Sequence, residues 1–138
     1  GIREMRKMGH LECNESITDE GLREMKEMKD LECNYNITDN GIREMRKMRY
    51  LICEYNHNIT DLGIREMREM RELTCNDRIT DFGIREMHKM RYLDCSNSEN
   101  ITETGIREMH KMRYLDCGYN VNITEEMRKE IAERNFRK

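Results

Sequence analysis

The 138-residue chain lacks the features that mark several common protein classes. No apolar run approaches the ~20 residues of a membrane-spanning helix, so the sequence predicts no membrane partner, and it shows no signal peptide pattern. The net charge is only -3, which argues against a nucleic-acid partner because such a binder needs a net basic surface. The chain begins inside a repeat at Gly1 without an initiator methionine, so we expect a fragment, a processed chain or an expressed segment.

The sequence also lacks the usual motifs of metal sites and active sites. It contains no C-x-x-C, and its four histidines show no ligand spacing. There is no Ser-His-Asp set, no pair of carboxylates in an apolar context and no phosphate-binding loop. We therefore expect no catalytic residues, no metal, no cofactor and no enzymatic activity.

What the sequence does contain is one phrase repeated about six times. The spacings between successive cysteines are 20, 20, 22, 20 and 22 residues, and the glycines that open each helical phrase follow the same series. Twelve of the thirteen methionines form pairs in the same phase. The cysteines are Cys13, Cys33, Cys53, Cys75, Cys95 and Cys117. A fixed period of this length is typical of a solenoid.

One repeat predicts one strand and one short helix. The phrase "MRYLICEYN", residues 48–56, follows the pattern L-x-x-L-x-L-x-x-N, in which Leu51 and Cys53 alternate with an outward Ile52. Thr and Asp then favour a helix start. In "GIREMREM" the residues Ile64, Met67 and Met70 are three apart, which places them on one face of a helix of about two turns. A helix this short is expected to be partly 3₁₀.

The fold class predicted from these units is an α/β solenoid. No unit can bury its apolar face alone, so stacking must bury the Leu, Ile, Met and Cys columns. We expect a parallel sheet on the concave face, short helices on the convex face and modest curvature. Residues 1–138 would form a single domain, with a capping helix at 124–136. No equivalent cap precedes the first strand near residues 11–13, so that strand is expected to be an exposed edge.

The repeat phrase carries a family resemblance. "LxCxxNxIT" followed by "DxGI" is similar to the cysteine-containing class of leucine-rich repeat proteins, which is known from F-box-type substrate adaptors. The shorter period of 20 to 22 residues resembles more closely the compact arrays encoded by giant viruses of amoebae. The resemblance implies a leucine-rich repeat fold with a binding role. The near-identity of the repeats is also compatible with a recently duplicated or consensus-designed chain.

The cysteines and asparagines have simple structural interpretations. The cysteines fall at inward strand positions, where a free thiol behaves as a small hydrophobe. Reduced thiols favour an intracellular location, with association with a virion as a further expectation. Asn14, Asn36, Asn58, Asn100 and Asn122 begin formal glycosylation motifs, but we interpret them as turn residues that bond to the backbone.

The outward strand positions suggest a binding surface. All six tyrosines fall at the third or eighth position of the nine-residue phrase, and a column of Lys or Arg fills the second position. Acidic residues recur at the fifth position. Tyr and Arg are enriched at binding hot spots. The candidate partner-binding residues are Tyr35, Arg49, Tyr50, Tyr55, Arg71, Arg91, Tyr92, Arg113, Tyr114 and Tyr119.

The sequence thus predicts a non-enzymatic scaffold that binds a protein or peptide on its concave sheet. Six strands of about seven residues present a face on the order of 500 Å², below the ~800 Å² per partner of a stable interface. A peptide ligand or a longer array would suit that area. The alternative is a structural or self-assembling component that forms a homo-oligomer through the edge of its first repeat.

Overall fold

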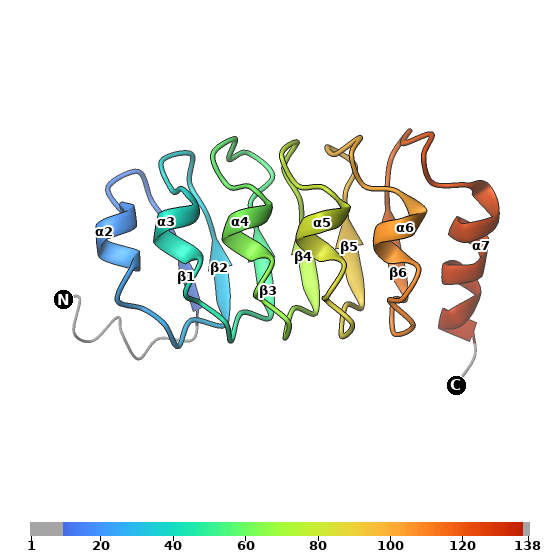
Figure 1. Cartoon of the computed structure of the whole chain (residues 1–138), viewed down its shortest axis with the longest axis horizontal. Helices are drawn as coiled ribbons and strands as arrows, with labels where there is room; N and C mark the ends of the chain where they lie inside the picture. Colours follow the sequence, from blue (N-terminus) through green and yellow to red (C-terminus); the bar gives the residue numbers. More distant parts are fainter. Residues whose placement is uncertain (1–9, 137–138) are drawn as a thin grey trace.

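The computed structural model describes residues 10–136 and shows one continuous parallel sheet with short helices stacked against it (Figure 1). The six strands lie side by side in sequence order. They are β1 (His10–Glu12), β2 (Asp30–Glu32), β3 (Tyr50–Ile52), β4 (Glu72–Thr74), β5 (Tyr92–Asp94) and β6 (Tyr114–Asp116). The predicted α/β architecture with a parallel sheet is confirmed.

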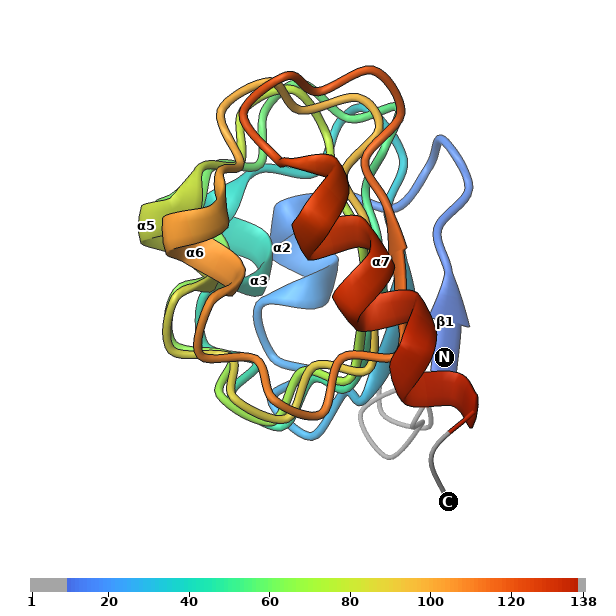
Figure 2. The ribbon, with the colours of Figure 1, turned by 90° about the vertical axis from the view of Figure 1, so that its right-hand side faces the viewer.

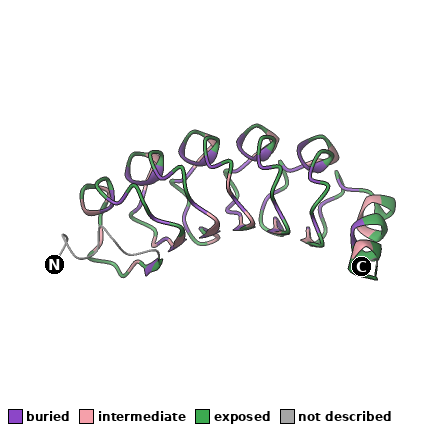
Figure 3. Cartoon of the chain, turned by 90° about the horizontal axis from the view of Figure 1, so that it is seen from below, coloured by how far each residue is buried: buried purple, intermediate pink, exposed green. Residues whose placement is uncertain are grey.

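A helix follows each strand and returns the chain to the start of the next. The one-turn helices are α2 (Asp19–Leu22), α3 (Asp39–Ile42), α4 (Asp61–Ile64), α5 (Asp81–Ile84) and α6 (Glu103–Ile106). Figure 3 shows them on the outside of a shallow arc, with the strands on the inside. Strands pack ~4.8 Å apart, whereas helices pack 8–10 Å apart. The helical layer is therefore the longer of the two, and the array curves with the helices on the outside.

The predicted helix of two turns is wrong in length. The helix α4 begins at Asp61, two residues before the phrase "GIREMREM", and ends at Ile64. The chain then continues in three-residue turns, in which Met67 N–H donates to Ile64 O and Met70 N–H to Met67 O. Turns of this kind keep residues three apart on one side. Ile64, Met67 and Met70 are therefore all fully buried although only the first is helical.

The core consists of apolar columns that run the length of the array. Each inner repeat buries the strand Leu, the Cys two residues later, the Ile of "IT", the residue after the helix glycine and both methionines. In the repeat of β4 these include Leu73, Cys75, Ile79 and Ile84, and each of these four is 0% exposed. No repeat completes this core alone, so stability depends on stacking.

A polar ladder runs beside the apolar columns at the strand-to-helix turns. Asn56 is fully buried, and its Nδ2 donates to Asn34 O and Ile37 O of the preceding repeat. Its Oδ1 accepts from the N–H groups of Asn58 and Ile59. The equivalent ladder residues are Asn34, Asn76, Ser98 and Asn120. The structure thus assigns the ladder to Asn56 and leaves Asn58 at the surface.

The ladder position also locates the two extra residues of the longer repeats. The ladder residue always lies three positions before the Ile of "IT", so the insertions fall between it and the cysteine, at Glu54–Tyr55, Ser96–Asn97 and Gly118–Tyr119. A tight turn closes around each inserted pair, for example by Asn56 N–H donating to Cys53 O (3.0 Å). Gly118 has a φ of 50° in the last of these turns, a conformation that glycine adopts without strain.

A second polar contact joins each helix to the next. The Asp39 carboxylate accepts from the backbone N–H (2.7 Å) and the hydroxyl of Thr60, the N-cap of α4. The same carboxylate-to-threonine clamp links Asp19 to Thr38, Asp61 to Thr80, Asp81 to Thr102 and Glu103 to Thr124. In the four aspartate clamps the helix glycine lies against the carboxylate. A Cβ on Gly63 would overlap Asp39 Oδ1 and come within 3.2 Å of Asp39 Cα.

The array ends in a longer helix. The helix α7 (Glu125–Glu133) continues into the 3₁₀ turn η1 (Arg134–Phe136), and Figure 2 shows α7 crossing the end of the stack. Ile131 is buried and Met127 is half-buried against the core, while Phe136 is exposed. At the other end, β1 is the first described element, since residues 1–9 lie outside the described residues. The prediction that no cap precedes β1 concerns those residues and stays a prediction.

We expect Gly63→Ala to destabilise the fold because the new methyl group displaces the Asp39 carboxylate from Thr60. Overpacking of this kind costs about 1–3 kcal/mol. Gly21→Ala is the matched control, since nothing lies within 4 Å of a Cβ at that position and alanine favours a helix. Urea unfolding of both variants measures the difference. Equal stability of the two variants would contradict the clamp.

Candidate functional site

The outward face of the sheet carries two columns of side chains. The strand register places Asp30, Tyr50, Glu72, Tyr92 and Tyr114 in one column. The second column, two residues further along each strand, contains Glu32, Ile52, Thr74, Asp94 and Asp116. The sheet face is therefore aromatic and acidic, and the strands themselves carry no Lys or Arg between residues 10 and 136.

Two of the predicted tyrosines form a stacked pair. The rings of Tyr92 and Tyr114 lie 4.5 Å apart between centroids and are inclined by only 3°. Burial raises the pKa of Tyr92, and the neighbouring Tyr114 and carboxylates act in the same direction. Tyr114 is 48% exposed, which leaves one aromatic surface open to a ligand.

Tyr50 lines a hollow at the middle of the sheet that extends to Tyr92 of the stacked pair. A depression of about 320 Å³ is lined by Tyr50 and Tyr92 of the first column and by Ile52 and Thr74 of the second. Glu72 lies between the two tyrosines on the intervening strand, and Asp30 closes one end. Asp30 is paired with His10 (2.9 Å), so Glu72 is the carboxylate left for a ligand. The sequence analysis did not include Glu72, because it considered tyrosines at the third position of the phrase and acidic residues at the fifth, and Glu72 is an acidic residue at the third position.

The remaining tyrosines lie away from the sheet face, at the strand-to-helix turns. Tyr35 and Tyr55 line a shallow hollow with His57 and Asp77. His57 Nδ1 and Asp77 Oδ1 are 2.8 Å apart, and this hydrogen bond lowers the pKa of Asp77. Tyr119 is fully exposed beside Val121. Tyr55 and Tyr119 belong to the inserted pairs, which explains why they project from the array.

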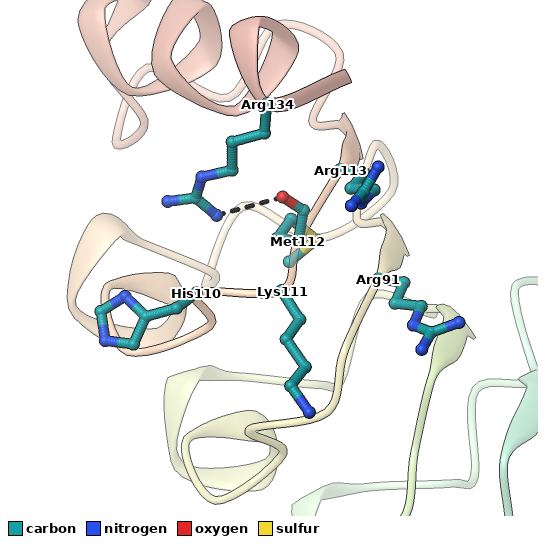
Figure 4. A pocket seen from close by; sticks show the side chains of 6 residues that line it. All are labelled: Arg91, His110, Lys111, Met112, Arg113 and Arg134. Atoms are coloured by element: carbon teal, nitrogen blue, oxygen red, sulfur yellow. Dashed lines mark hydrogen bonds between the residues drawn. The ribbon is translucent and has the colours of Figure 1, made fainter. Parts of the chain in front are cut away.

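The predicted arginines occupy a third location. Arg49, Arg71, Arg91 and Arg113 lie in the turns that lead from a helix into a strand, each one residue before the strand begins. Arg91 and Arg113 line a cleft of about 670 Å³ together with His110, Lys111, Met112 and Arg134 (Figure 4). No tyrosine is among these residues. The structure therefore divides the ten predicted residues among the sheet face, the upper turns and the turns that precede the strands, and only Arg91 and Arg113 of the last group line the cleft.

Arg134 fixes the cap beside that cleft and was missed by sequence reasoning. Its Nη1 donates to Met109 O (3.0 Å) and Met112 O (3.1 Å), and the Asn135 amide donates to Arg113 O (2.7 Å). In the inner repeats the equivalent arginine carbonyl accepts from the next repeat, as Arg91 O does from Arg113 N–H, so Asn135 takes the place of that contact at the end of the array. The only signal in the sequence is that the repeat pattern ends after Thr124, and this does not indicate what the Arg134 side chain does.

The asparagines of three glycosylation motifs take part in turn contacts. The side chains of Asn36, Asn58 and Asn122 donate to the backbone oxygens of Glu15, Tyr35 and Glu99. Each bond joins one repeat to the preceding one. This agrees with their interpretation as turn residues.

The cysteines form a buried column without disulfides. All six are free, and only Cys13 is half-buried, because it lies in the first described repeat. Burial raises the pKa of Cys53 and Cys95 to about 12 and that of Cys13 to about 11. Between residues 10 and 136 no group of three His, Cys, Asp or Glu side chains could hold a metal ion. In the same range no helix is long and apolar enough to cross a membrane.

Comparisons with known proteins agree on the fold. No protein-family model matches the sequence, and no curated protein matches it. Among solved structures, an internalin from Listeria monocytogenes superposes with a TM-score of 0.59 and 16% identity over 83% of this chain. The structure of the TLR13–ssRNA13 complex gives a TM-score of 0.60 and 12% identity, also over 83%. The chain spans 42% and 20% of those two proteins. Its fold is a leucine-rich repeat solenoid.

We expect the native thiols to resist modification, because the raised pKa values keep them protonated at pH 8 and the core excludes reagent. Cys13 should react first with Ellman's reagent, and the other five only on unfolding. Cys13→Ser is the control, since it should remove the early reaction alone. Rapid reaction of most thiols in the native protein would contradict a buried column.

Proposed function

We propose that the chain is a non-enzymatic scaffold that binds a protein or peptide on its concave sheet. The observation that carries this proposal is the Tyr92–Tyr114 stack, in which two aromatic rings pack against each other on an open face. Rings that are already ordered lose little conformational entropy when a partner covers them. Tyrosine side chains on such a surface are typical binding hot spots.

The surroundings of the stack suggest the chemistry of the ligand. Glu72 lies between Tyr50 and Tyr92 in register, so a cationic side chain can pair with the carboxylate and contact the rings. Asp94 and Asp116 extend the acidic character along the neighbouring column. A Lys- or Arg-containing peptide in extended form therefore fits better than an acidic one. The small area of the face also favours a peptide over a large globular interface.

Selection from a displayed library of random peptides tests this proposal directly. We expect enriched peptides to carry Lys or Arg, and Tyr92→Ala combined with Tyr114→Ala to weaken their binding at least about tenfold, since each hot-spot tyrosine contributes more than ~1 kcal/mol. Affinity is measured by calorimetry on purified peptides, after thermal unfolding has shown that the variant folds.

Leu62→Ala combined with Phe82→Ala is the matched control. Both side chains are exposed hydrophobics, 59% and 44% accessible, on the helical side. Peptide affinity should not change in this variant. An absence of enriched peptides, or equal losses in the two double variants, would refute the concave site.

A further inference from the structure

The turns that lead from each helix into the next strand carry eleven of the 25 Lys and Arg residues of the protein. We call these turns, residues 26–29, 46–49, 68–71, 88–91 and 110–113, the return edge; it runs along the lower border of the array in Figure 1. It contains eleven Lys or Arg and two Glu, a net charge of +9 in a chain of net charge -3. The basic residues are Lys26, Lys29, Arg46, Lys47, Arg49, Arg68, Arg71, Lys89, Arg91, Lys111 and Arg113.

The two glutamates of the return edge are already neutralised. Glu27 is paired with Lys47 of the next repeat, and Glu69 with Lys89 at 2.5 Å. The hydrogen bond from Lys89 lowers the pKa of Glu69, and Arg49 and Arg71 also contribute. The remaining cations are exposed or half-buried. Arg68 is also paired, with Glu66 just outside the return edge (3.8 Å). The return edge still carries an excess of positive charge at this border.

The spacing of these cations is regular because the backbone sets it. Arg71 and Arg91 N–H groups donate to the carbonyls of Arg49 and Arg71, and Arg113 N–H to Arg91 O, all at 2.8–2.9 Å. Neighbouring arginines thus begin from strands ~4.8 Å apart. A row of like charges at this spacing opposes folding. A linear polyanion would relieve that repulsion along the whole row.

The surface outside the return edge has a net negative charge. This corrects the argument that the net charge of the whole chain excludes a nucleic-acid partner. Six carboxylates on the strands, Glu12, Asp30, Glu32, Glu72, Asp94 and Asp116, face the concave side. Together with the other carboxylates outside the return edge, they outweigh its positive charge in the net charge of the chain. Net charge excludes a nucleic-acid partner only when charge is spread evenly, and here the stacking of repeats has separated it by face.

Aromatic rings lie next to this basic row. Arg49, Arg91 and Arg113 are each followed directly by a tyrosine, the first residue of the strand. Two of these tyrosines form the stacked pair. Bases stack on aromatic rings while a basic track holds the phosphates, which is the usual arrangement in proteins that bind single strands. Paired bases in a duplex are not available for such stacking.

We propose that the return edge binds the phosphate backbone of a single-stranded nucleic acid, with bases reaching the tyrosines at the border of the sheet. This goes beyond the peptide site, since the phosphate contacts lie outside the concave face. The acidic columns keep phosphates off the sheet and direct them along the edge. Arg91, Lys111 and Arg113 border the cleft beneath the cap (Figure 4) and mark the end of the track.

Fluorescence anisotropy with labelled 12-nucleotide oligouridine and oligothymidine tests the proposal between 50 and 200 mM NaCl. The variant Lys29→Gln, Arg46→Gln, Lys111→Gln changes three exposed cations that the peptide site does not use. We expect it to reduce the slope of log affinity against log salt by about 2, since each lost contact contributes ~0.7 for single strands. The control variant Arg23→Gln, Arg43→Gln, Arg107→Gln removes the same charge from the convex side and should retain the original slope.

Three further comparisons, with a duplex, with a tyrosine variant and with oligoglutamate, test whether the partner is a single-stranded nucleic acid. A duplex of the same length should bind more weakly, and Tyr92→Ala with Tyr114→Ala should cost at least about fivefold for the single strand through lost stacking. No binding at 50 mM NaCl, or equal effects of the two triple variants, would overturn the proposal. Binding of oligoglutamate as tight as that of the oligonucleotides would overturn it in favour of an acidic protein partner. Peptide binding by the edge variant stays intact even if this proposal fails.

Discussion

The contact between each helix carboxylate and the next N-cap threonine is the constraint on which the repeat depends. Asp39 satisfies the free N–H of Thr60 and accepts its hydroxyl, while Thr60 accepts from Leu62 N–H inside its own helix. One-turn helices have little stability of their own, so this external bond holds them in phase. It also requires Gly63, because a side chain there would occupy the space of the carboxylate. At the last junction Glu103 replaces Asp and Met127 replaces the glycine, and the chain changes to a longer helix.

The asparagine ladder performs the corresponding task at the strand ends. Each buried amide joins carbonyls of the preceding repeat to N–H groups of its own, and no buried side-chain polar atom among the described residues lacks a hydrogen-bond partner. The ladder keeps its place three residues before the buried Ile, so additional residues are accommodated outside it. Tyr55 and Tyr119 arise in this way, as residues of inserted pairs that the core does not constrain. Variation in repeat length is therefore converted into surface features at one edge.

Much of this fold was predictable from particular residues. The phase of the cysteines, the strand Leu and the paired methionines predicted a stacked parallel sheet, and the burial of those columns agrees. The outward direction of Tyr50, Tyr92 and Tyr114 followed from alternation in a strand. The helix length was mispredicted because three-residue turns bury residues at the same spacing as a helix face. The reason for the glycines and the role of Arg134 were not visible, because both involve atoms of another repeat.

The sequence by itself determined the period, the apolar columns and the alternation of each strand, since these depend on side-chain order within one unit. Only the tertiary structure decided how units meet. It divided the predicted tyrosines and arginines between a sheet face, an upper edge and the return edge, although they are adjacent in the chain. It also collected the basic turns of five repeats at one border and the strand carboxylates on another face. The physical reason is that stacking turns a position in the repeat into a column in space, so charge that is balanced along the chain becomes separated across the surface.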